Sequence, residues 1–275
     1  PTANLAVNSK YFIKIADSAI QNAVGSTFAG IADATTYNFS TAAADGSIST
    51  TAYTGSVGSY LGFSVSSAGD VNADGYDDYI LGSYGNKAYV VYGNAGGVGA
   101  SLPNGTIASS LGFQITGADT LGYSVSGAGD VNGDGFADLI VGTNTNTSVA
   151  YVVYGASTMP ATVNVTGTNF SSANGFKITG QADSCFGWSV SSAGDVNGDG
   201  LSDLVISGAN AYVVYGNSTG STVTIDTNGA IAPSSGFRIA GLANYAVSSA
   251  GDVNGDGLAD VIVGKYATNG AVYVV

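Results

Sequence analysis

The sequence predicts an all-β protein made of repeated four-stranded units, on three observations. Glycine supplies 42 of the 275 residues, and Gly, Asn, Ser and Thr turns recur at intervals too short for helices. The segments between these turns are rich in Val, Ile, Tyr and Phe, as β-strands are. Finally, the string Ala-Gly-Asp-Val-Asn occurs four times, and its Asp recurs at 70, 130, 195 and 252. The spacings are 60, 65 and 57 residues, and such copying at a similar spacing is typical of repeat architectures.

Each copy contains the same strand-like segments in the same order. The first segment precedes the repeated string, at 62–65, 122–125, 187–190 and 244–247. An apolar run follows the string, at 79–81, 139–141, 204–206 and 261–263. A Tyr-Val-Val segment comes third, at 89–92, 151–154, 212–215 and 273–275. A Gly-Phe-x-Ile segment closes the first three copies, at 112–115, 175–178 and 236–239.

Four short strands in each tandem unit predict the blades of a β-propeller. A β-sandwich would show alternation of polar and apolar residues without such copying. We expect blades at about 60–117, 121–180, 185–241 and 244–275, the last without its fourth strand. A blade cannot bury both of its faces alone, so each blade is expected to depend on its neighbours.

The composition narrows the chemistry that the chain supports. All 19 acidic residues are Asp, His and Glu are absent, and Lys and Arg total six, for a net charge of −13. A Ser-His-Asp or Cys-His enzyme cannot be built without His. Nucleic acid and anionic membranes are not expected as partners, because both require clustered Lys and Arg. No apolar run approaches the about 20 residues of a membrane-spanning helix, so membrane insertion of this segment is not expected.

Most of the acidic residues lie in four nonapeptides, 70–78, 130–138, 195–203 and 252–260. In each loop, oxygen-bearing side chains occupy positions 1, 3, 5 and 9, and Gly occupies position 6. Ca²⁺ takes about six to eight oxygen ligands in a flexible cage, and a Gly at this place permits a sharp turn. A backbone carbonyl at position 7 would add a ligand, as in EF-hands, although position 12 is apolar and a strand follows.

We therefore predict one calcium site in each loop, about four in all. The expected side-chain ligands are Asp70, Asn72, Asp74 and Asp78; Asp130, Asn132, Asp134 and Asp138; Asp195, Asn197, Asp199 and Asp203; and Asp252, Asn254, Asp256 and Asp260. The expected carbonyl ligands belong to Tyr76, Phe136, Leu201 and Leu258.

Charge balance favours bound cations in these loops. Three Asp at the ligand positions of each of four loops account for 12 of the 19 acidic residues, and only six basic residues are present to compensate. Unpaired carboxylates this close together would repel one another. Four Ca²⁺ ions add 8 charges and would change the net charge from −13 to −5. Mg²⁺ is less suited, because it prefers octahedral sites that retain several waters. The alternative is a set of plain Asp/Asn/Gly turns.

The four copies resemble the FG-GAP repeats of the integrin α-subunit β-propeller. The resemblance rests on the loops and on the pairs Leu61-Gly62, Leu121-Gly122 and Phe186-Gly187. It implies that each loop joins the first two strands of a blade and binds Ca²⁺ through the positions given above. The GAP half of the motif is degenerate, and Asn244 replaces the expected Gly in the fourth copy. The family usually has seven blades, so the remainder of the ring lies outside this chain or the ring closes differently.

Residues 1–42 do not follow the repeat and resemble the last strands of a bacterial Ig-like domain of the surface-layer type. Alternatively, the segment 11–15 supplies the outer strand that the fourth blade lacks. Residues 43–58, rich in Ala, Ser, Thr and Gly, are expected to be a linker.

Together these features favour a non-enzymatic, calcium-binding module of a large bacterial cell-surface or secreted protein. Its role would be adhesion or self-assembly, with partners that are proteins or glycans at a cell surface or other copies of itself. The alternative is a sugar-binding or hydrolytic propeller enzyme of the extracellular space, since propellers also carry enzymes.

Overall fold

The structure is a computed structural model that describes residues 10–12, 38–40, 59–95, 106–145, 148–181, 185–241, 244–265 and 269–275. The chain divides into two compact units, Pro1–Ala52 and Tyr53–Val275. In the first unit, β1 (Lys10–Phe12) pairs antiparallel with β2 (Asn38–Ser40). The described partner of Tyr11 is thus Phe39. The rest of the predicted Ig-like segment and linker lies outside the described residues, so both assignments stay predictions.

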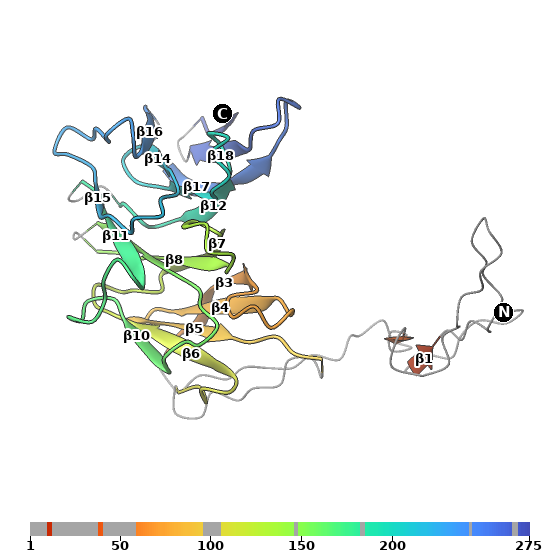
Figure 1. Cartoon of the computed structure of the whole chain (residues 1–275). Helices are drawn as coiled ribbons and strands as arrows, with labels where there is room; N and C mark the ends of the chain where they lie inside the picture. The colour runs from red at the N-terminus through yellow and green to blue at the C-terminus, as the bar shows by residue number, and fades with distance from the viewer. Residues whose placement is uncertain are drawn as a thin grey trace, which may run out of the picture. The chain divides into compact units, whose positions relative to one another are not determined.

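The second unit contains four sheets, one for each repeat (Figure 1). The first sheet contains β3 (Leu61–Gly69), β4 (Asp78–Ser83), β5 (Lys87–Val91) and β6 (Gly112–Thr116). The second contains β7 (Ser124–Gly129), β8 (Asp138–Gly142), β9 (Val149–Val153) and β11 (Gly175–Thr179). The third contains β12 (Val190–Gly194), β13 (Asp203–Ile206), β14 (Ala211–Val214) and β16 (Gly236–Ile239). The fourth contains β17 (Asn244–Gly251), β18 (Asp260–Lys265) and β19 (Ala271–Val274). These sheets confirm the predicted all-β fold with antiparallel propeller blades.

Two further strands extend the first and second sheets. The strand β10 (Thr162–Asn164) runs parallel to β6, and β15 (Val223–Thr224) runs parallel to β11. Each of these strands comes from the repeat that follows the sheet it joins. The sequence did not predict these two strands, because the alternation of polar and apolar residues in them is short and weak. The buried residue is Val163 in β10 and Val223 in β15.

The sheets pack face to face in sequence order through their inner strands β3, β7, β12 and β17 (Figure 1). Between the first two sheets, Ile80, Val90 and Phe113 belong to the same buried cluster as Val141 and Val153. Two comparable clusters fill the next two junctions. The described residues follow one another in this order without closing a ring (Figure 1).

A serine hydroxyl aligns each pair of neighbouring sheets. The backbone N–H of Val125 donates to Ser64 Oγ at 3.1 Å, and that of Val190 donates to Ser124 Oγ at 3.1 Å. The N–H of Val247 donates to Ser189 Oγ at 3.2 Å. These bonds fix how far one inner strand is shifted along the next, and thereby place the loops at the strand ends side by side.

Candidate metal centre

Each Asp-rich loop connects the first and second strands of a blade, as the resemblance implies. The loops leave the ends of β3, β7, β12 and β17 and lead into β4, β8, β13 and β18. A glycine with a positive φ of 71° to 78° ends every inner strand, at Gly69, Gly129, Gly194 and Gly251. This conformation suits glycine, and it turns the chain into the loop.

The first Asp of the loop organises the turn around itself. In the second blade, Asp130 Oδ1 accepts the N–H groups of Gly133 at 2.7 Å and Asp134 at 3.1 Å. Its Oδ2 accepts the N–H of Gly135 at 2.9 Å. The third and fourth loops repeat all three bonds, and the first loop repeats the last two. The predicted sharp turn at position 6 is made in this way, with Gly135 at a φ of 88°.

The side chains at positions 3 and 5 support one another. Asn132 Oδ1 accepts the N–H of Asp134 at 2.9 Å, and Asn132 Nδ2 donates to Asp134 Oδ2 at 2.8 Å. Asp134 Oδ1 in turn accepts the N–H of Phe136 at 3.0 Å. The same N–H bonds recur in the other loops. In the fourth loop the Asn254 amide donates to Asp260 Oδ1 instead, at 3.5 Å.

The ninth residue is buried and holds the loop against the sheet. Asp138 is fully buried; its Oδ2 accepts the N–H of Val131 at 2.8 Å and its Oδ1 that of Gly155 at 2.9 Å. Asp78 and Asp203 are buried and make the matching bonds. Burial, partly offset by these N–H groups, raises the pKa of Asp138 to about 7. Burial likewise raises the pKa of Asp78 and of Asp203 to about 6.

The donor set fits a hard cation chemically, although the loop holds its shape through its own hydrogen bonds. Each Asp or Asn oxygen atom has two lone pairs, and at least one pair remains on every predicted side-chain ligand of the second loop. Within the described part of the chain, no three acidic or Cys side chains are gathered closely enough to hold a metal ion. A cation would therefore have to draw these carboxylates together, as the flexible oxygen cage of Ca²⁺ permits.

The loops are also connected from blade to blade, which the sequence analysis missed. The backbone carbonyl of Asp70 accepts the N–H of Ala137 at 3.1 Å. Asp130 and Asp195 accept the N–H groups of Ser202 and Ala259 in the same way, at 2.8 and 2.9 Å. The signal was present in the small residues at position 8, because a larger side chain would meet the glycine that ends the preceding inner strand.

The fold and these loops define a class of protein, a β-propeller repeat with an Asp-rich loop between its first two strands, and the comparisons with known proteins agree with this class. Residues 121–153 match the FG-GAP repeat family, and residues 195–263 match the FG-GAP-like repeat family. Together with the relatives below, these two matches support an FG-GAP, integrin-like repeat module.

Similar proteins include several integrin α subunits. Integrin alpha pat-2 of Caenorhabditis briggsae is 38% identical over 88 residues, which are 30% of this chain and 7% of that protein. Integrin alpha-7 of Rattus norvegicus is 27% identical over 225 residues, 78% of this chain and 18% of that protein. Integrin alpha-V of Gallus gallus is 28% identical over 236 residues, which are 78% of this chain and 21% of that protein. The chain thus spans a fifth or less of the length of most of these relatives.

Proposed function

We propose that this chain is a calcium-binding, non-enzymatic module of a large extracellular or cell-surface protein that acts in adhesion or self-assembly. The observation that carries the proposal is the fourfold repetition of one oxygen-rich loop at the same place in each blade. Extracellular calcium modules bind at about 10⁻⁴–10⁻³ M, a range that suits millimolar Ca²⁺ outside cells. No helix in the described residues has the length and apolar character needed to cross a membrane.

In this proposal calcium rigidifies the blade loops. The ion would be held by the side chains at positions 1, 3, 5 and 9 and by the carbonyl at position 7, and it would offset the repulsion among three carboxylates per loop. Because consecutive loops are joined by backbone hydrogen bonds, order in one loop supports the next. Partners would be proteins or glycans at a cell surface, or other copies of the chain. The protein would come from a bacterium.

Calcium removal tests the metal assignment. At a free Ca²⁺ concentration 100 times the dissociation constant, one site stabilises a protein by about 2.7 kcal/mol. We expect the melting temperature of the full chain to fall when excess chelator replaces millimolar Ca²⁺. An unchanged melting temperature would contradict the calcium proposal.

A charge variant separates metal binding from loop structure. Asp134→Asn retains an oxygen that accepts the N–H of Phe136 but removes, at an exposed position, one negative charge and the acceptor for Asn132 Nδ2. We expect the melting temperature in chelator to stay within about 1–2 °C of the parent and the increase produced by Ca²⁺ to shrink. The exposed Asp77, which lies in the first loop but outside the ligand positions, supplies the control Asp77→Asn, which should keep the full calcium response.

Particle size distinguishes the two roles within the proposal. Light scattering in millimolar Ca²⁺ and then in excess chelator would reveal large assemblies that dissolve on chelation if the module builds a layer or filament. A monomer under both conditions would favour adhesion to a separate ligand. Hydrolysis of a polysaccharide by the purified chain would instead support the enzyme alternative.

A further inference from the structure

A tyrosine and a polar side chain form a cross-strand pair at the same place in three blades. The pairs are Tyr89 with Gln114, Tyr151 with Lys177 and Tyr212 with Arg238. Directly opposed residues of antiparallel strands lie on the same face of the sheet. The tyrosine hydroxyl and the polar end of its partner therefore reach the same side of each blade.

In the third blade, the loop between β15 and β16 supplies a hydrogen-bond acceptor for both members of this pair. The Tyr212 hydroxyl donates to the carbonyl oxygen of Gly229 at 3.3 Å, and Arg238 Nη1 donates to the same oxygen at 3.1 Å. The loop is held there by Asp226, whose Oδ1 accepts the N–H groups of Asn228 and Ala230, both at 2.8 Å. One peptide carbonyl is thus the common acceptor for both donors.

In the second blade the matching loop is shorter and leaves the pair open. Val165 and Ile225 occupy equivalent places, because their N–H groups donate to Thr116 and Thr179, the last residues of β6 and β11. The loop then runs to a side chain that contacts the first glycine of the outer strand, Phe170 in the second blade and Ile231 in the third. Between these two points the second blade has four residues (166–169) and the third has five (226–230).

No described residue replaces the missing carbonyl in the second blade. Tyr151 is only 7% exposed, yet its hydroxyl has no hydrogen-bond partner in the part of the chain that the structure describes, and neither does the Lys177 ammonium. Burial and, to a smaller extent, the negative charge of Asp119 raise the pKa of Tyr151. The hydroxyl therefore remains protonated and available as a donor at neutral pH.

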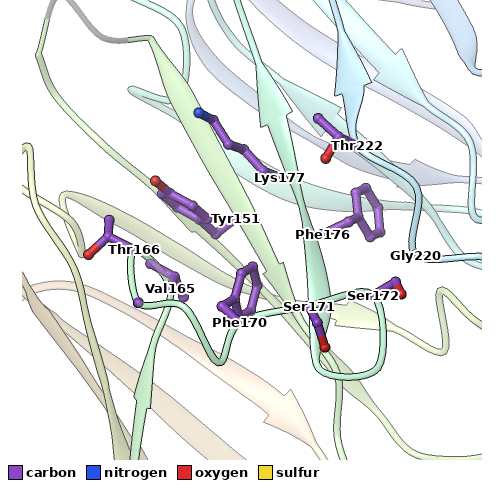
Figure 2. A pocket seen from close by; sticks show the side chains of 12 residues that line it. Tyr151, Val165, Thr166, Phe170, Ser171, Ser172, Phe176, Lys177, Gly220 and Thr222 are labelled. Carbon is purple, nitrogen blue, oxygen red and sulfur yellow. The ribbon is translucent and has the colours of Figure 1, made fainter.

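The space beside this pair is a cavity of about 410 Å³ (Figure 2). Figure 2 shows the Tyr151 hydroxyl and the Lys177 ammonium reaching toward the same region, with the Phe170 ring beside Tyr151. The ring centroids of Tyr151 and Phe170 are 6.1 Å apart. Hydroxyl side chains complete the lining, namely Thr166, Ser171, Ser172 and Thr222. The volume lies within the about 300–1,000 Å³ of typical ligand sites.

We propose that this cavity, the outer pocket of the second blade, binds an N-acetylated sugar unit of a glycan. Two donors converge on it, so the ligand must present an acceptor, and the acceptor in the third blade is an amide carbonyl. An acetamido group carries the same carbonyl, and its methyl group can pack on the Phe170 ring. A neutral sugar also avoids repulsion by a chain of net charge −13.

The structure favours a sugar over a peptide as the source of that amide. Peptides commonly dock by adding a strand to a free sheet edge, but β11 is paired with β9 along its length and with β15 at Ile178 and Thr179, which leaves only three residues for an added strand. The four hydroxyl side chains of the lining suit the hydroxyl groups of a sugar ring. The inference rests on the proposed adhesion role only in naming a ligand class, since the calcium loops do not line the pocket.

Titration of the full chain in millimolar Ca²⁺, followed by NMR, tests the proposal. The probe is the β-1,4-linked trimer of N-acetylglucosamine, and the matched control is cellotriose, which differs only in carrying hydroxyl groups in place of the acetamido groups. We expect the trimer to shift the resonances of Tyr151 and Lys177 and to bind at least about 5-fold more tightly than cellotriose. Equal affinities, no binding, or binding of an N-acetylated tripeptide in place of the trimer would overturn the proposal.

Two tyrosine variants locate the site. Tyr151→Phe removes a hydroxyl that has no hydrogen-bond partner among the described residues, so the melting temperature should stay the same while affinity for the trimer falls about 3- to 10-fold. Tyr212→Phe removes the bond to Gly229 in the third blade and should leave affinity unchanged. Unchanged affinity in Tyr151→Phe would contradict the assignment. Because the calcium response is measured separately by melting, failure of this proposal and failure of the calcium proposal are distinguishable.

Discussion

At the residue scale, the ninth Asp of each loop combines two roles, one proposed and one structural. It is a predicted cation ligand, and in the first three blades it also accepts two backbone N–H groups. One of those groups belongs to the loop, and the other, as with Gly155 for Asp138, follows the third strand. The carboxylate therefore ties the loop to the segment that follows the third strand of its own blade, with or without a metal.

Asp138→Ala measures this structural role when calcium is absent. The substitution leaves two N–H groups unsatisfied beside a fully buried position, so we expect it to lower the free energy of unfolding by about 2–5 kcal/mol. Asp260→Ala is the matched control, because Asp260 is half-buried and, among the residues that the structure describes, accepts one backbone N–H, that of Val253. Asp260→Ala should lower the free energy of unfolding by about 1 kcal/mol.

Both values come from urea unfolding in excess chelator. Similar losses for the two variants would indicate that the burial of Asp138 does not matter to the loop.

The sequence predicted the residue identities of the loops but only part of their geometry. The spacing of Asp, Asn and Gly was enough to place a sharp turn at position 6, and the turn is present at Gly135. The burial of Asp138 could not be foreseen, because its bond to Gly155 joins residues brought together only by the sheet. The open Tyr151–Lys177 pair was equally hidden, since it depends on a loop shorter by one residue.

At the scale of elements, glycines at the ends of the inner strands determine how closely the blades approach. A Cβ atom on Gly194 would lie 2.6 Å from the Cβ of Ala259 in the next blade, too close for real atoms. Gly251 occupies the same position in the fourth blade, but a Cβ there would meet nothing within 4 Å in the described structure. The two positions have nearly equal φ values, 78° and 71°.

Gly194→Ala and Gly251→Ala therefore separate backbone strain from blade packing. Both variants force a non-glycine residue into a left-handed conformation, at about 1–2 kcal/mol each. Only Gly194→Ala must also push two blades apart, for which we expect a further loss of about 1–3 kcal/mol in the free energy of unfolding. Equal destabilisation of the two variants by denaturant unfolding would disprove the packing argument.

The strands of each repeat were predictable from sequence, whereas the fifth strands were not. Four segments of Val, Ile, Tyr and Phe per copy indicated β6, β11 and β16 as closing strands, and the structure has them. The strands β10 and β15 contain only three and two residues and pair in parallel with the preceding repeat. Periodicity indicates a strand but not its partner, so this exchange lay beyond the sequence.

At the scale of the whole molecule, the two end blades expose faces that the inner blades bury. Val65 of β3 is 63% exposed, whereas Val125 at the same place in β7 is 4% exposed. At the other end, Val274 of β19 is 52% exposed, whereas Val152, its counterpart in β9, is fully buried. Apolar faces of this kind promote association with other molecules.

Val274→Lys tests that exposure. We expect it to leave the free energy of unfolding within about 0.5 kcal/mol of the parent, as exposed substitutions do, and to reduce self-association in light scattering. The counterpart Val152→Lys places an unpaired charge between two blades and should prevent folding. Strong destabilisation by Val274→Lys would show that the face is covered in solution.

The sequence predicted the order of the blades but left open how the ring is completed. Repetition is a local property of the chain, and each junction repeats the serine contact seen between Ser64 and Val125. In the fourth blade Ala246 stands where that serine belongs, so the next junction would lack the same hydroxyl acceptor. Closure depends on that junction, which a repeat pattern alone does not specify.

The exchange of outer strands between repeats has a consequence for synthesis on the ribosome. Thr116 ends β6 and pairs with Asn164 of β10, so 48 further residues (164 minus 116) must be translated before the first sheet is complete. The second sheet likewise waits for Thr224, the partner of Thr179. Each of these two nascent blades thus remains unfinished until its successor emerges, so a stop in translation within the second or third repeat leaves two incomplete blades instead of one.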